Sequence, residues 1–169
     1  IKLADGRNLE IEKVAKEYEE GNQNYVYSIN EKNEWVIKPV SWAGITRRNA
    51  KTLKITLDNG KEVISTPDHR FMLRDGSYEE AQNLKEGTSL MPIDAERYFF
   101  VSSVEEYDTL EKTYDITVDE ETPNFALEAG IVIHNSQMDI KFSRFIERIQ
   151  SQIIKGLNKI AALELFFQG

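Results

Sequence analysis

The sequence predicts an all-β domain over residues 1–135, followed by an amphipathic helix within residues 136–169. In the first part, short runs alternate apolar and polar residues, and turn-forming residues separate these runs at short intervals. The second part differs, because its apolar residues recur at helical three- and four-residue steps. The helical stripe consists of Phe142, Phe145, Ile146, Ile149, Ile153, Leu157 and Ile160.

The N-terminal elements are a short strand and a short helix. Ile1–Leu3 is apolar, polar and apolar, and the turn pair Asp5-Gly6 ends it. Asn8 is expected to cap a helix, because an Asn side chain can accept a hydrogen bond from a free N–H of the first turn. The helix ends at Gly21, and its apolar face consists of Ile11, Val14, Ala15 and Tyr18.

The rest of the domain is predicted to consist of strands. A hairpin joins Thr52–Leu57 to Lys61–Thr66 across Asp58-Asn59-Gly60, since Asn-Gly is a strong turn signal. Tyr78–Asn83 is expected to form a single helical turn. The other predicted strands are Tyr25–Ile29, Glu34–Val40, Ser89–Pro92, Tyr98–Glu105, Lys112–Val118, Phe125–Leu127 and Ile131–His134.

Composition excludes several classes of function. There are no cysteines and two histidines, so disulfides and thiolate metal sites are excluded and a histidine-rich metal site is not expected. Carboxylate metal sites stay open by composition, but we predict neither a metal nor a cofactor. Residues 1–135 carry 16 basic and 26 acidic side chains, which argues against nucleic-acid binding. The sequence shows no membrane span and no signal-peptide pattern, so the expected location is the cytoplasm, with no membrane partner.

The strongest chemical signal is the tripeptide His134-Asn135-Ser136 at the end of an apolar run. An Asn side-chain amide can attack its own main-chain carbonyl, which closes a succinimide and cuts the bond to the next residue. The Ser136 hydroxyl can carry an acyl group as an ester. His134 can donate or accept protons beside both residues. This arrangement suits a protein that rearranges its own backbone.

Two further segments, together with this tripeptide, resemble motifs of inteins, the self-splicing members of the Hedgehog/intein (Hint) superfamily. Thr66-Pro67-Asp68-His69 resembles the second motif block, and Gly130–Ser136 resembles the final block. Tyr114–Val118 with Asn124–Leu127 resembles the penultimate block. The resemblance implies a horseshoe of β-structure over residues 1–135 that performs single-turnover protein splicing. The stretch between Pro92 and Thr113 is too short for a homing endonuclease, so a minimal intein is expected.

The resemblance also implies roles for three residues outside the tripeptide. His69 would protonate the amide nitrogen at the upstream junction, and Thr66 would orient that peptide. Asp115 would be a hydrogen-bond partner and proton acceptor for the nucleophiles. The alternatives are a strand-ending turn for Thr66 and His69, and an exposed acid on a strand for Asp115.

The sequence departs from the intein pattern at two places. Pro123 stands where many inteins have a histidine, so Asp115 or His134 is expected to carry more of the later steps. Roughly seven residues that precede the position of Ile1 in inteins, including the first nucleophile, are not in this sequence. We therefore expect an N-terminal intein fragment to act in trans, as in atypically split inteins, unless the chain is a truncated one.

Residues 136–169 are interpreted as the downstream host segment, the C-extein. The segment from Asp139 to Phe145 loosely resembles phage portal proteins, and Leu163–Gly169 resembles a protease tag. An alternative is that the tail packs on the domain. The alternative function is a non-catalytic β-domain that binds a partner through its amphipathic helix.

Overall fold

A computed structural model of the chain describes residues 1–118 and 123–135. Contacts divide the chain into Ile1–Ser136 and Gln137–Gly169. The predicted C-terminal helix and Ser136 lie outside the described residues, and the domain boundary after residue 135 stays a prediction. Within the described ranges, no helix is both long and apolar enough to cross a membrane.

Helix α1 spans Ile11–Glu19 and confirms the predicted N-terminal helix. Val14 and Ala15 are buried on its apolar face. The predicted Asn8 cap is wrong: the residue at the cap position is Glu10, which makes no side-chain capping bond. The reason is that Asn8 forms an isolated antiparallel bridge with Lys2 instead.

The first sheet is the antiparallel hairpin of β1 (Tyr25–Ile29) and β2 (Trp35–Pro39). The sequence predicted both strands but not their pairing. Within its turn, the Asn30 side chain accepts hydrogen bonds from the main chain of Lys32 and Glu34. Local side-chain bonding of this kind is why Asn is favoured in turns.

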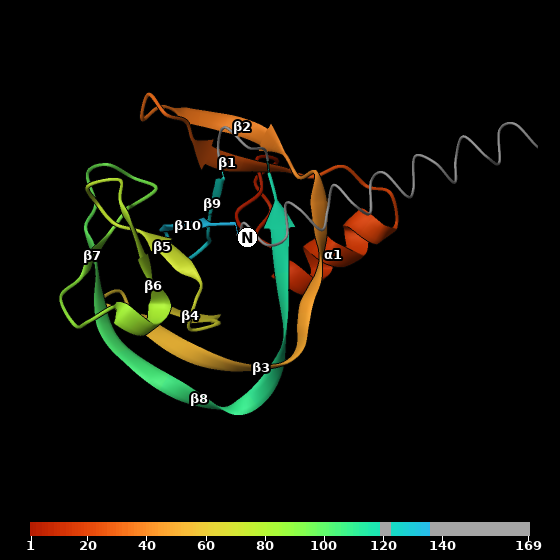
Figure 1. The fold of residues 1–169 in the computed structure, drawn as a ribbon. Coiled ribbons are helices and arrows are strands. Elements are labelled where there is room, and N and C mark those ends of the chain that lie inside the picture. Colours follow the sequence, from red (N-terminus) through yellow and green to blue (C-terminus); the bar gives the residue numbers. More distant parts are fainter. Residues whose placement is uncertain (119–122, 136–169) are drawn as a thin grey trace, which may run out of the picture. The chain divides into compact units, whose positions relative to one another are not determined.

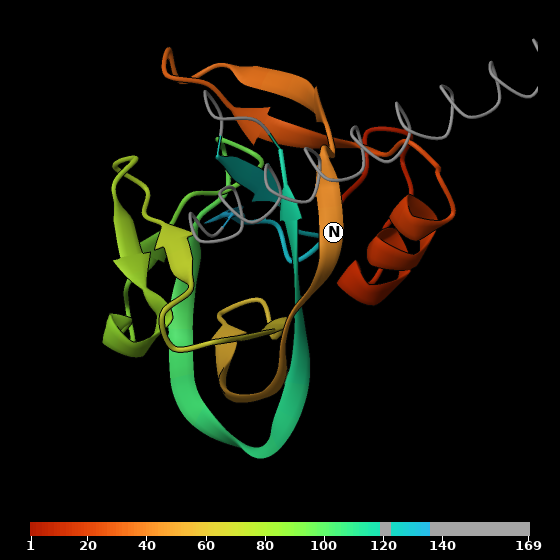
Figure 2. The same cartoon turned by 45° about the vertical axis from the view of Figure 1, so that its right-hand side comes forward.

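The second sheet is built on two long strands, β3 (Trp42–Leu57) and β8 (Phe99–Thr117), which pair antiparallel along most of their length. Strands β4 (Glu62–Ser65) and β7 (Ser89–Leu90) complete the order β4-β3-β8-β7. The predicted hairpin is confirmed as the β3–β4 pair. Figure 1 and Figure 2 show β3 and β8 curving together. Register shifts interrupt this pair at four places, and such irregularities bend strands.

One correction concerns β8. The sequence predicted separate strands at Tyr98–Glu105 and Lys112–Val118, but β8 is continuous between them. The sequence between the two predicted strands does not alternate apolar and polar residues. It is nevertheless extended, because β3 pairs with this part of β8.

The third sheet has the order β6-β5-β10-β9 and carries the C-terminal motif. Its strands are β5 (Arg70–Met72), β6 (Tyr78–Glu80), β9 (Asn124–Ala126) and β10 (Val132–His134). The sequence did not predict β5. The helical turn predicted from Tyr78 is half right, because β6 comes first and a 3₁₀ turn, η1, follows at Ala81–Asn83.

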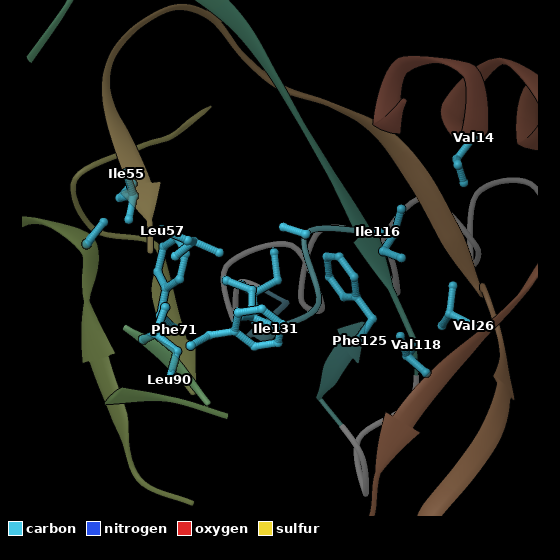
Figure 3. Close-up of a cluster of buried hydrophobic side chains, with 14 of the residues drawn as sticks. Val14, Val26, Ile55, Leu57, Phe71, Leu90, Ile116, Val118, Phe125 and Ile131 are labelled. Atoms are coloured by element: carbon cyan, nitrogen blue, oxygen red, sulfur yellow. The ribbon is translucent and has the colours of Figure 1, made fainter. Parts of the chain in front are cut away.

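One hydrophobic core joins α1 to all three sheets. In Figure 3, Ile131 lies between Phe71 and Leu90 on one side and Phe125 on the other, and all four side chains are fully buried. Ile131 directly precedes β10, so the core fixes the start of the strand that carries His134. The all-β prediction with one or two short helices is confirmed.

We predict that Gly130→Ala destabilises the fold more than Gly60→Ala. Both glycines have positive φ, +96° and +78°, where an added Cβ costs about 1–2 kcal/mol. At Gly130 the Cβ would also lie 2.8 Å from the Phe99 ring, whereas nothing lies within 4 Å at Gly60. Overpacking adds about 1–3 kcal/mol, so urea unfolding should separate the two variants by that amount. Equal losses of stability would show that Phe99 moves aside freely.

Candidate functional site

The central strand β10 places the end of the C-terminal motif inside the protein. β10 pairs with β9 on one side and with β5 on the other, and all three of its residues are buried. The register sets His134 opposite Asn124. The next main-chain N–H, that of Asn135, donates to the Pro123 carbonyl at 3.0 Å. Pro123 therefore anchors the main chain of Asn135.

The Asn135 side chain is buried and has no hydrogen-bond partner among the described residues. The residue is 1% exposed, and neither Oδ1 nor Nδ2 has a hydrogen bond among the described residues. An unsatisfied buried amide costs about 1–3 kcal/mol, so such a group calls for an explanation. The main-chain N–H of Asn135 is held by a hydrogen bond, whereas its side-chain Nδ2 has no hydrogen bond to any described residue.

His134 contacts the main chain of the residue that follows it. Desolvation lowers the pKa of His134, a hydrogen-bonding contact with the Asn135 backbone opposes this, and nearby Arg70 lowers the pKa further. A hydrogen bond raises the pKa of a histidine when a ring N–H is the donor. The only acceptor on a main chain is a carbonyl oxygen. The direction of this effect is the one expected for a ring N–H of His134 directed at the Asn135 carbonyl.

The structure brings the two histidines within electrostatic range. Burial lowers the pKa of His69 to about 4, with a further lowering from His134 and an opposing effect from Asp68. His69 is partly exposed as a residue, but its Nε2 is buried and makes no bond within the described part of the chain. The His69 main chain is held by Thr66, whose carbonyl accepts its N–H at 3.1 Å.

The two remaining predicted site residues within the described ranges, Thr66 and Asp115, each make a local hydrogen bond. Burial raises the pKa of the Asp68 carboxyl group, but hydrogen bonds from Arg47 and, to a smaller extent, from the Thr66 side chain lower it overall. Asp115 is only 4% exposed on β8, so it is not the exposed acid that the sequence left as an alternative. Its Oδ1 accepts the Ile116 N–H at 2.8 Å. The catalytic roles of all six predicted residues stay predictions.

The sequence missed two neighbours of His134. The Tyr78 ring lies perpendicular to the imidazole, with 4.8 Å between the ring centroids. Asn124, opposite His134, hydrogen-bonds the Tyr78 side chain. Asn124 stands in a recognised motif but had no assigned role, and no local signal marks Tyr78.

We predict that protonation of His69 destabilises the fold in acid. Its pKa of about 4 in the folded protein lies below the ordinary value of 6.5, so the folded state binds this proton more weakly. The contribution of neutral His69 to the free energy of unfolding is therefore complete above pH 6.5. It is lost as the pH falls toward 4, by on the order of 3 kcal/mol.

Urea unfolding at a series of pH values checks this prediction. His69→Gln should lose less stability between pH 6.5 and 4 than the parent chain does. A histidine NMR titration that places the His69 midpoint near 6.5 would contradict it.

Comparison with known proteins gives two partial sequence matches. The chain is 44% identical over 93 residues to a DNA gyrase subunit of Synechocystis sp., and the match covers 55% of this chain and 9% of that protein. It is 31% identical over 91 residues to the replication factor C small subunit of Methanocaldococcus jannaschii, or 5% of that protein. The chain thus spans less than a tenth of the curated relatives it matches. No family model matches the sequence.

The solved structures with similar folds are inteins and an intein-like domain. A DnaB intein from Synechocystis sp. PCC 6803 has a TM-score of 0.69 at 22% identity, over 80% of this chain and 93% of that one. An intein-like domain from Clostridium thermocellum has a TM-score of 0.62 at 24% identity, with the same coverage. The PabCDC21-1 intein has a TM-score of 0.65 at 22% identity, over 79% of this chain and 93% of that one. Residues 1–135 therefore have the curled, all-β Hint fold of the inteins.

Proposed function

We propose that residues 1–135 are a protein-splicing element that cuts the peptide bond after Asn135. One observation carries this proposal: Asn135 has a buried side-chain amide, unpartnered among the described residues, on a main chain that is held on both sides. A structural asparagine in a protein interior normally has its amide hydrogen-bonded. An asparagine that must attack its own carbonyl needs the opposite arrangement.

The proposed cleavage needs no added reagent. The Nδ2 of Asn135 attacks its own main-chain carbonyl carbon, which forms a five-membered imide. The bond from that carbon to the Ser136 nitrogen breaks, and the proton lost from Nδ2 passes to the departing amine. Holding the reacting groups in place can remove about 7–11 kcal/mol of the barrier.

His134 would supply the electrostatic part of the step. Its N–H at the Asn135 carbonyl would stabilise the negative charge that develops on that oxygen during the attack. Its lowered pKa keeps the ring neutral near pH 7, and a neutral imidazole has one nitrogen that can accept a proton.

The upstream half of splicing would use the other predicted residues. An acyl group arriving as an ester would move to the Ser136 hydroxyl, while His69 and Thr66 act on the upstream peptide and Asp115 accepts protons. Since each chain consumes its own Asn135, the reaction would be a single-turnover event that joins two host segments, the exteins.

We further propose that an N-terminal intein fragment takes part in trans. The Lys2 N–H donates to the Ala126 carbonyl at 3.2 Å, so the segment beginning at Ile1 lies against β9. Residues placed before Ile1, in the same polypeptide or in another one, would start beside the strand that pairs with β10.

Mass spectrometry after incubation of the purified chain tests the central claim. We expect a fragment that begins at Ser136, and a body ending at Asn135 whose mass is one water lower than that of the free acid. The mass deficit identifies the imide and distinguishes it from hydrolysis. A chain that stays intact, or a body that already has the full acid mass at the earliest time points, before the imide can hydrolyse, would refute the proposed cleavage.

A further inference from the structure

One face of the third sheet surrounds the His134 side chain. Asn124 lies directly opposite His134 on β9, and Arg70 flanks it on β5, because Ile133 pairs with Phe71. Tyr78 begins the outer strand β6, where it pairs with Met72. Its ring reaches the imidazole and stands perpendicular to it at 4.8 Å. Aromatic rings attract each other in this edge-to-face arrangement.

The Tyr78 hydroxyl bonds Asn124, whose side chain is fixed to β1. The Asn124 Oδ1 accepts the Ile29 N–H at 2.8 Å, and its Nδ2 donates to the Ile29 carbonyl at 2.9 Å. An amide nitrogen has two hydrogens, so the second is available for the Tyr78 hydroxyl. This bond lowers the pKa of Tyr78, although burial, the larger effect, raises it overall.

These contacts form a continuous chain from β1 to the site. Ile29 on β1 fixes Asn124 on β9, Asn124 holds the hydroxyl of Tyr78, and the Tyr78 ring lies against His134. Ile29 also belongs to a small apolar cluster with Met72 and Val132, against which Tyr78 packs. The Tyr78 ring is therefore held mainly by apolar packing against residues of β1, β5 and β10, and the bond of its hydroxyl to Asn124 is secondary.

We propose that Tyr78 is a positioning residue that holds the His134 ring against the Asn135 carbonyl. The inference rests on the proposed function, because its consequence is a faster cleavage after Asn135. An N–H must point at the carbonyl oxygen to stabilise its developing charge, and an imidazole turned away gives no such help. A displacement of about 1 Å can slow such a step about a hundredfold.

The test compares variants that remove the ring with one that keeps it. Tyr78→Leu and Tyr78→Met remove the contact, so the rate of cleavage should fall about tenfold or more. Tyr78→Phe keeps the ring and loses only the hydroxyl, so its rate should stay within about threefold of the parent. Tyr78 is half-buried on the outer strand β6, so we expect these variants to fold.

A second measurement follows His134 directly and does not depend on cleavage. In an Asn135→Ala background, the imidazole NMR signals of the two histidines are titrated, with His69→Gln for assignment. Tyr78→Leu and Tyr78→Met should raise the pKa of His134 toward its ordinary value, since water replaces the ring. Tyr78→Phe should leave that pKa low.

Tyr18 supplies a matched control. Its hydroxyl donates to the Ser41 carbonyl at 2.8 Å in another part of the fold. Tyr18→Phe and Tyr18→Leu should leave the His134 titration unchanged. If the Leu and Met variants at Tyr78 titrate like the Phe variant, the positioning role is wrong, whatever the rates. If the parent chain never cleaves, the proposed function fails, while the titration still decides the role of Tyr78.

Discussion

Asn135→Ala should abolish the release of a fragment that begins at Ser136. Alanine has no amide with which to form the imide, and no neighbouring group replaces it within the described residues. The loss should be complete on the time scale of the parent reaction, because intramolecular attack accounts for about 7–11 kcal/mol of the barrier that is overcome. Mass spectrometry of both chains after identical incubation measures the effect.

The structure indicates that this variant folds. The Asn135 side chain makes no hydrogen bond among the described residues, so the substitution breaks none. Removing an unsatisfied amide relieves about 1–3 kcal/mol, which offsets the lost packing. Asn135→Gln is the matched control: it keeps an amide but must close a six-membered ring, and it should cleave far more slowly. Persistent release from Asn135→Ala would refute imide chemistry.

Local sequence was sufficient for elements whose signals are local. Asp58-Asn59-Gly60 predicted its hairpin because the Asn59 side chain bonds the Lys61 N–H and Gly60 adopts a positive φ. The helical spacing around Val14 predicted α1, because one face of a helix buries residues at that spacing.

Local sequence failed where a distant partner decides the structure. The charged middle of β8 has no strand pattern of its own, and β3 keeps it extended. Asn8 has a good capping side chain, but its pairing with Lys2 determines its position instead.

In the candidate site, too, the residues that are adjacent in sequence were predicted, and those brought together by strand pairing were not. His134, Asn135 and Ser136 are adjacent in the chain, so the sequence could propose their chemistry directly. Tyr78 and Asn124 reach His134 only through the register of β5, β9 and β10, which no local pattern encodes. The unpaired state of the Asn135 amide among the described residues likewise depends on burial from several elements.

A peptide that supplies the upstream junction should be ligated to Ser136. The peptide would carry an N-extein, then a serine, then a Gly-Asp-Thr turn of the kind that inteins have. The N-extein acyl group would first move from the peptide nitrogen to the hydroxyl of this serine, which forms an ester. Transesterification would then transfer the acyl group to the Ser136 hydroxyl. Cyclisation of Asn135 would release residues 1–135, and the freed Ser136 amine would convert the ester into a peptide bond. With serine in the peptide and no cysteine in the chain, the yield should not depend on reductant.

His69→Ala should block this ligation while leaving cleavage after Asn135 largely intact. His69 would serve the upstream amide, and loss of a general acid typically slows a step about 10²–10⁴-fold. His134, which contacts the Asn135 main chain, remains in place in this variant. Gel quantification of ligated and cleaved products in the same reaction measures both rates. An equal decrease of the two would mean that His69 only supports the fold around His134, whose charge it senses. Retained ligation would instead assign the upstream proton transfer to another group.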